Sequence, residues 1–172
     1  VYYGFNVESE AGFRAVKAMA SFLAKRYNGK NGHGKITNWV VGNEINNQYW
    51  NYMGDLDVSA YTSKFQRAFR VFYTAMKSVS ANDNIMFSLD HYWNMFPEAA
   101  PVGKYKGKDI LLAFHNYEEA EGYMDYGLAL HPYPYPIYSP NFWDDDTTGR
   151  VNDTMDSPIV NFKNLHVITD FM

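Results

Sequence analysis

The chain has 172 residues, of which 47% are hydrophobic and 20% charged, and its formal net charge is −4. This composition predicts one globular domain over residues 1–172 and excludes a disordered chain. The negative charge, without any basic block, argues against nucleic acid and anionic membranes as partners. No apolar run approaches the roughly 18 residues of a membrane span. The absence of Cys excludes disulfides, thiolate metal sites and Cys nucleophiles.

Aromatic residues make up 18% of the chain, with 15 Tyr, 12 Phe and 4 Trp. Many of them lie in polar, loop-like surroundings rather than at core spacing. Aromatic faces in a cleft stack well on the apolar C–H faces of sugar rings. A core and surface rich in Tyr would account for the same composition, so the count leaves both interpretations open.

Predicted strands and helices alternate along the chain. Short apolar runs that end on polar residues indicate strands: the end of one at 2–6, and others at 36–44, 85–89 and 126–130. The run at 36–44 is β-branched and typical of a strand buried on both faces. Helices are predicted to begin at Ser9, at Asp57 or Ser59, and at Lys108. The second of these carries a stripe that we expect in the core: Tyr61, Phe65, Phe69, Phe72, Met76 and Val79.

The last segment of the chain has two interpretations. Ser157 followed by Pro158 is a good helix start, and apolar residues then recur at intervals of three up to Phe171. This pattern favours a helix from Ser157 to the end. The alternative is a strand over 165–169 that ends on Asp170.

The alternation of strands and helices predicts an α/β fold with a parallel sheet. Both a doubly wound sheet and a barrel place ligands at the carboxyl ends of such strands. No G-x-G-x-x-G and no P-loop follows any strand, which removes the commonest nucleotide-binding interpretations. We therefore predict a (β/α)8 TIM barrel. Four strands are half of one, so we expect the chain to be a central segment of a longer protein.

Each complete predicted strand ends on candidate site residues. A carboxyl held at a rigid strand end, such as Glu44, can act as a general acid or base. Asn43 beside it can bind a substrate hydroxyl. We expect the other substrate-binding residues to come from the loop after this strand and from the ends of the next two strands: Trp50, Asp90, His91, Trp93, His131 and Tyr133.

Simpler roles for these residues remain open. Glu44 can cap its loop and pair with a nearby Arg or Lys, and Asp90 can cap the loop that follows its strand. A metal-dependent hydrolase using Asp90, His91 and His131 is a further alternative. No pair among them has the spacing of a metal-binding helix motif, so we expect no metal and no cofactor.

At Gly42-Asn43-Glu44 and His131-Pro132-Tyr133 the sequence resembles the TIM-barrel glycoside hydrolases of the large retaining clan that contains cellulase-like and β-galactosidase-like enzymes. In that clan an Asn-Glu pair ends the fourth strand and a His-x-Tyr ends the sixth. The whole chain resembles, more closely, the middle of an uncharacterised bacterial family related to the clan. The opening Tyr-Tyr-Gly-Phe-Asn, the Val-Gly-Asn-Glu-Ile-Asn-Asn stretch and the final segment from Asn164 carry this resemblance.

The resemblance implies that Glu44 is the acid/base of a retaining hydrolase and that Asn43 contacts the sugar 2-hydroxyl. His131 and Tyr133 would orient the nucleophile or the sugar. The clan's nucleophile is a Glu that ends the seventh strand, and this chain has no such Glu. A final helix would put the nucleophile beyond Met172, whereas a final strand would put Asp170 in its place.

We therefore expect a glycoside hydrolase acting on a β-linked oligo- or polysaccharide, with a carbohydrate as its partner molecule. The alternative is a non-catalytic carbohydrate-binding barrel that kept the cleft and lost the nucleophile. Relatives that degrade polysaccharides are usually exported, so the resemblance favours a secreted or cell-surface location. The sequence does not determine the oligomeric state.

Overall fold

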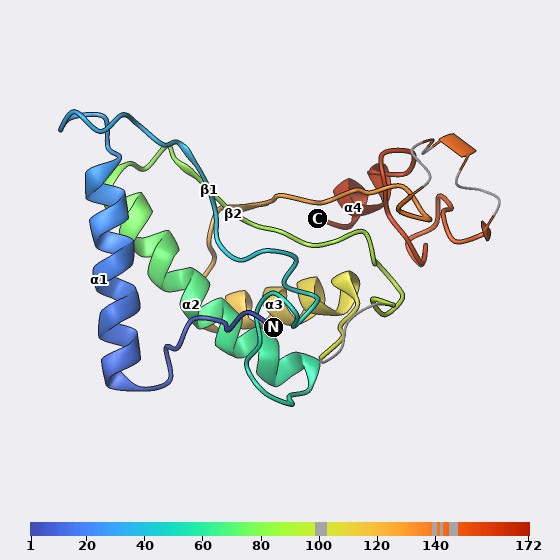
Figure 1. The fold of residues 1–172 in the computed structure, drawn as a ribbon, viewed down its shortest axis with the longest axis horizontal. Helices are drawn as coiled ribbons and strands as arrows, with labels where there is room; N and C mark the ends of the chain where they lie inside the picture. The colour runs from blue at the N-terminus through green and yellow to red at the C-terminus, as the bar shows by residue number, and fades with distance from the viewer. Residues whose placement is uncertain (99–102, 139–140, 142, 145–147) are drawn as a thin grey trace.

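The computed structural model describes residues 1–98, 103–138, 141, 143–144 and 148–172. Its elements follow one another in the order α1, β1, α2, β2, α3, β3 and α4, coloured along the chain in Figure 1. The helices are α1 (Glu10–Arg26), α2 (Val58–Val79), α3 (Gly107–Glu121) and α4 (His166–Phe171). The strands are β1 (Asn38–Val40), β2 (Asn84–Phe87) and β3 (Tyr126–Leu128).

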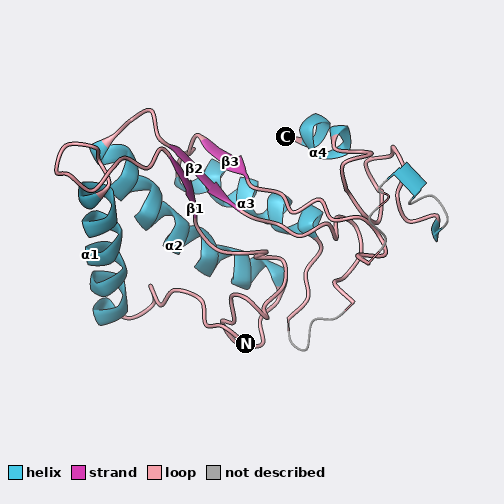
Figure 2. Ribbon diagram, turned by 45° about the horizontal axis from the view of Figure 1, so that its top comes forward, coloured by secondary structure: helices cyan, strands magenta, loops and turns pink. Residues whose placement is uncertain are grey.

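The three strands form a parallel sheet in the order β1-β2-β3, which confirms a mixed α/β fold with a parallel sheet. Trp39, Ile85 and Tyr126 lie side by side in the register. Figure 2 shows the strands against α2 and α3. Ile85 and Phe87 point towards these helices and are fully buried. On the opposite face Val40 is 53% exposed, so helices cover one face of the sheet.

The core lies between the sheet and the helices. The α2 stripe from Tyr61 to Met76 is buried as predicted, although Val79 at its end is exposed. The ring of Phe69 meets those of Phe87, Phe114 and Tyr126 edge to face, with centroids 5.5–6.1 Å apart. Such contacts between aromatic rings add to the free energy gained from burial. This cluster fixes α2 and α3 against β2 and β3.

Side-chain caps set the starts of α1 and α2 where the sequence predicted them. The Ser9 hydroxyl accepts a hydrogen bond from the Gly12 N–H at the start of α1, at 3.1 Å. Asp57 accepts one from the Ala60 N–H at the start of α2, at 2.7 Å. Each side chain satisfies a backbone donor that the first helical turn leaves unpaired.

The segment 2–6 is not a strand of the sheet, so the prediction that it ends one is wrong. Tyr3 makes a single parallel bridge to Tyr52 in the loop after β1. The Tyr2 N–H donates to the Tyr49 carbonyl, and the Tyr52 N–H donates to the Tyr2 carbonyl. This segment therefore pairs with the loop that follows β1 and not with β1 itself.

The strand predicted at 36–44 is shorter and less buried than expected. β1 covers three residues, and Val40 is exposed because no described helix packs on the face that it occupies. Pairing to β2 nevertheless continues beyond β1: the Val41 N–H donates to the Met86 carbonyl and the Ile45 N–H to the Ser88 carbonyl. The backbone around Glu44 is thus still held against the neighbouring strand.

The prediction of a helix from Ser157 is also wrong, because only His166–Phe171 is helical. The buried Ser157 donates its hydroxyl to the Ile159 carbonyl, at 2.7 Å. The Asn164 amide donates to the carbonyls of Asn152 and Ile159. These side-chain bonds hold the segment in an irregular path and compete with helix formation. The strand alternative is wrong too, since Asp170 lies in α4 and is exposed.

Candidate active site

Hydrogen bonds between neighbouring strands bring the three predicted strand ends together. The Ile45 N–H donates to the Ser88 carbonyl, at 2.9 Å, and the His131 N–H donates to the Leu89 carbonyl, at 2.8 Å. These bonds extend the pairing of the sheet past its regular strands. Glu44, Asp90 and His131 consequently lie at one edge of the sheet, where ligands of parallel α/β folds bind.

Glu44 is anchored through both its backbone and its side chain. Its N–H donates to the Ser88 hydroxyl, at 2.7 Å. One carboxyl oxygen, Oε1, lies 2.7 Å from Nδ1 of His131, and the other, Oε2, accepts the Trp50 indole N–H at 2.8 Å. The Glu44 side chain is 14% exposed. The carboxyl is therefore fixed in direction and still reachable from solvent.

Asp90 and Asn46 are joined by two hydrogen bonds. The Asn46 amide donates to Asp90 Oδ1 at 2.5 Å, and its oxygen accepts the Asp90 N–H at 3.0 Å. The Tyr92 N–H donates to the same carboxyl oxygen, at 2.9 Å. Burial raises the pKa of Asp90 to about 7, although the hydrogen bonds from Asn46 and Tyr92 lower it. Glu44 adds to the increase, and His131 opposes it.

Tyr133 and His91 adjoin the pair of Glu44 and His131. The Tyr133 ring meets the His131 ring at a steep angle, with centroids 5.6 Å apart, and its hydroxyl is 3.5 Å from His131 Nδ1. His91 Nδ1 lies 3.0 Å from the Tyr133 carbonyl. Burial and the negative charge of Glu44 raise the pKa of Tyr133. The tyrosine hydroxyl is thus a neutral partner for His131.

Asn43 and Trp93, two of the predicted binding residues, differ in their exposure to solvent. Asn43 is exposed, and its carbonyl accepts the Asn51 amide at 2.7 Å. Trp93 is 1% exposed, donates its indole N–H to the Met155 carbonyl at 3.0 Å and packs against Phe171. The Trp93 ring therefore has no free face for a sugar, and its assignment to the binding site needs correction.

A polar cluster next to His91 was not predicted. Arg150 donates to the Glu98 carboxyl and contacts the Tyr135 hydroxyl, and that hydroxyl donates to Glu98 at 2.8 Å. The Arg150 hydrogen bond, with that from Tyr135, lowers the pKa of Glu98. The Tyr135 ring lies edge-on to His91, with centroids 6.0 Å apart. The cluster joins the loop after β2, through Glu98, to two parts of the long segment after β3, through Tyr135 and Arg150.

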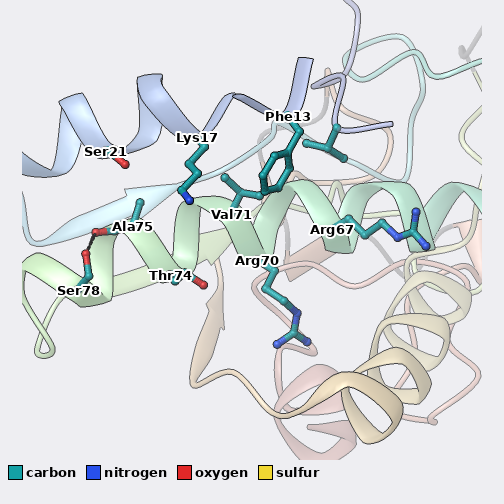
Figure 3. A pocket seen from close by; sticks show the side chains of 10 residues that line it. Phe13, Lys17, Ser21, Arg67, Arg70, Val71, Thr74, Ala75 and Ser78 are labelled. Atoms are coloured by element: carbon teal, nitrogen blue, oxygen red, sulfur yellow. Dashed lines mark hydrogen bonds between the residues drawn. The ribbon is translucent and has the colours of Figure 1, made fainter. Parts of the chain in front are cut away.

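A cleft of the described structure lies elsewhere, between α1 and α2. It has a volume of about 490 Å³, and Figure 3 shows Phe13 and Lys17 of α1 next to Val71 of α2. Arg67 and Arg70 of α2 also line it. None of its lining residues comes from the end of a strand. Within the described part of the chain, no three His, Cys, Asp or Glu side chains are placed to hold a metal ion. No described helix has the length and apolar character needed to cross a membrane.

Comparison with known proteins gives one match. A family model described as a family of unknown function, DUF5722, matches residues 1–172. No curated protein and no solved structure matches the chain.

Proposed function

Because the chain belongs to the DUF5722 family, whose function is unknown, we propose a function from the geometry of the site. The proposal is a glycoside hydrolase that cleaves a β-linked oligo- or polysaccharide with retention, with Glu44 as the acid/base. The observation that carries it is the setting of Glu44. This partly exposed carboxyl follows β1 and has a partner on each oxygen, Trp50 and His131, and Asp90 lies in the segment after the neighbouring strand β2.

We further propose that residues 1–172 form a central part of a TIM barrel. The parallel order β1-β2-β3, with a helix in each connection, suits such a segment. The face that carries Val40 would then form the barrel interior. The segment 2–6 contributes no strand to this arrangement, so the proposal rests on three strands.

In the proposed reaction, the protonated Glu44 gives its proton to the glycosidic oxygen as the bond to the anomeric carbon breaks. A second carboxylate bonds to that carbon and forms a glycosyl-enzyme. Glu44, now ionised, takes a proton from water. The water oxygen attacks the anomeric carbon, and the second carboxylate leaves.

The described residues do not supply an evident second carboxylate. Asp170 is exposed on α4. Asp90 is buried, its Oδ1 accepts hydrogen bonds from Asn46 and Tyr92, and burial raises its pKa to about 7. We therefore place the nucleophile outside the described residues. The non-catalytic carbohydrate-binding barrel remains the second candidate, and the missing carboxylate is the observation that favours it.

The test compares the intact protein with its Glu44→Ala variant on aryl β-glycosides that have good or poor leaving groups. Loss of a general acid should lower kcat/KM on poor leaving groups by about 10²–10⁴-fold. Good leaving groups need little protonation, so their first step should slow much less. Azide should restore turnover on these substrates, because it replaces the water that Glu44 would activate.

The matched control is Glu119→Gln, which changes an exposed carboxyl on α3 and should leave both rates unchanged. Equal, negligible turnover by the parent and Glu44→Ala, with oligosaccharide binding retained in both, would support the binding barrel. In that case the hydrolase proposal fails.

A further inference from the structure

Three aromatic side chains form a connected surface next to Glu44. The ring of Tyr2 stacks on that of Trp50, with centroids 5.5 Å apart and an angle of 20° between the planes. Tyr49 meets Trp50 edge to face at 4.8 Å and Tyr2 at 6.1 Å. We call Tyr2, Tyr49 and Trp50 the aromatic triad. It extends outward from the carboxyl, because Trp50 donates its N–H to Glu44 Oε2.

The triad presents an open aromatic face although its rings pack on one another. Tyr2 is the outer ring of the stack and is 61% exposed, and Tyr49 is also exposed. A folded chain does not gain stability from leaving such area in water. Exposed aromatic groups that join a polar site are typical of binding surfaces.

The backbone beneath the triad is held in place. The Tyr2 N–H donates to the Tyr49 carbonyl, at 2.8 Å, and the Tyr52 N–H donates to the Tyr2 carbonyl, at 2.7 Å. The buried Gln48 bridges its own loop, since its amide donates to the Gly54 carbonyl and its oxygen accepts the Met53 N–H. A surface ordered before binding loses less conformational entropy when a ligand arrives.

We propose that the aromatic triad binds the leaving-group side of a neutral, β-linked oligosaccharide, one or two sugar units beyond the bond that is cleaved. This inference rests on the proposed function of Glu44. The general acid lies beside the leaving oxygen, and the triad adjoins the Glu44 oxygen bound by Trp50. His131 and Tyr133 lie on the side of the other oxygen. The substrate is therefore a chain with several sugars and not a small glycoside.

The test measures kcat/KM for the intact protein and for Tyr2→Leu, Tyr2→Ala and Tyr49→Ala. The substrates are an aryl β-glycoside, which has no sugar on the leaving-group side, and four pentasaccharides: cellopentaose, xylopentaose, mannopentaose and β-1,4-galactopentaose. Each substitution should lower kcat/KM on the preferred pentasaccharide by about three- to tenfold, the value of one aromatic contact. The rate on the aryl glycoside should stay unchanged. Tyr2→Leu keeps an apolar group on Trp50 and guards against loss of folding.

Tyr3→Ala is the matched control. Tyr3 is 81% exposed on the same backbone pairing, but its ring packs on Tyr52 and not on the triad. It should leave all rates unchanged. An equal loss on both substrate types would mean that the triad only positions Glu44. No loss on the pentasaccharide would mean that it binds nothing there. Either result overturns the inference.

Failure of the hydrolase proposal would be seen separately, as a parent protein no more active than Glu44→Ala. The aromatic triad is then tested by binding: the protein is titrated with the same four pentasaccharides, and its tryptophan fluorescence is measured. Weaker binding by Tyr2→Leu, with normal binding by Tyr3→Ala, would retain the triad as a saccharide surface and remove only its leaving-group role. Binding of none of the four by the parent would overturn the inference entirely.

Discussion

Glu44 combines a functional side chain with an unusual backbone. Among the described residues, Glu44 is the one non-glycine residue that has a positive φ, which is 43°. The left-handed region costs an L-residue roughly 1–2 kcal/mol. The bond from its N–H to the Ser88 hydroxyl, and the two bonds to its carboxyl, hold this conformation. Such conformations are often found at active sites, where surrounding contacts offset their cost.

The buried Asp90 makes stability depend on pH. An Asp side chain in the unfolded chain ionises near pH 3.9, whereas Asp90 in the fold has a pKa of about 7. Between these values the folded chain holds a proton that the unfolded chain has released. The contribution of Asp90 to stability therefore falls as the pH rises from about 4 to about 7, by at most about 4 kcal/mol.

We expect Asp90→Asn to remove this fall in stability with rising pH. The amide oxygen can still accept the bonds from Asn46 and Tyr92, and the amide does not ionise. The variant should match the parent in Tm near pH 4 and exceed it at pH 8, as measured by circular dichroism. The control, Asp125→Asn, changes a side chain that is 94% exposed and should follow the parent throughout. A Tm difference between Asp90→Asn and the parent that does not change with pH would contradict the buried carboxyl.

The turn that ends β1 depends on a glycine. Gly42 has a φ of 84°, and a Cβ there would lie 2.8 Å from Ile45 Cγ2 and 3.0 Å from Phe65 Cε2. Backbone conformation and space both exclude a side chain. This close packing lets the loop with Glu44 approach α2.

Gly42→Ala should therefore lower the free energy of unfolding by about 2–4 kcal/mol, from left-handed strain and overpacking together. Urea denaturation measures the loss. Gly32→Ala is the matched control: its φ is 81°, but no atom lies within 4 Å of the added Cβ. It should lower the free energy of unfolding only by the strain of the left-handed backbone, about 1 kcal/mol. Equal losses for the two variants would show that packing at Gly42 is unimportant.

The elements also show which features a single sequence can predict. Strand ends place Glu44 and His131 next to each other, because parallel strands meet at one edge, and the 2.7 Å contact confirms that proximity. The pairing of Asn46 with Asp90 has no local signal, since it joins two strand ends that are 44 residues apart. At Ser157 the sequence pattern favours a helix start, but no helix forms there, because the Asn164 side chain donates hydrogen bonds to the Ser157 hydroxyl and the Ile159 carbonyl. These contacts depend on the tertiary fold.

At the scale of the whole molecule, the sheet has two unlike faces. Val40 and Val41 are adjacent in sequence, yet Val40 is exposed and Val41 is buried. Figure 1 shows the segments after β2 and β3 running away from the sheet towards α4. The bridge between Tyr92 and Ile159 joins the first of these segments to the end of the chain. The helices thus cover one face of the sheet, while the face with Val40 is open among the residues that the structure describes.

The proposed barrel makes a definite prediction about this open face. The interior of a closed barrel is packed with side chains, so Val40 would be buried in the intact protein. Val40→Thr keeps the shape of the side chain and adds a hydroxyl. In a closed barrel it should lower the free energy of unfolding by about 1–3 kcal/mol, the cost of burying an unpaired polar group. Val41→Thr, on the buried side, should cost a similar amount and is the matched reference. Urea denaturation of the intact protein measures both.

A cost below about 0.5 kcal/mol for Val40→Thr alone is expected of a solvent-exposed position. That result would leave the sheet open in the intact protein and remove the barrel, while the cluster of Glu44, Asp90 and His131 would stand as a site on a three-stranded sheet.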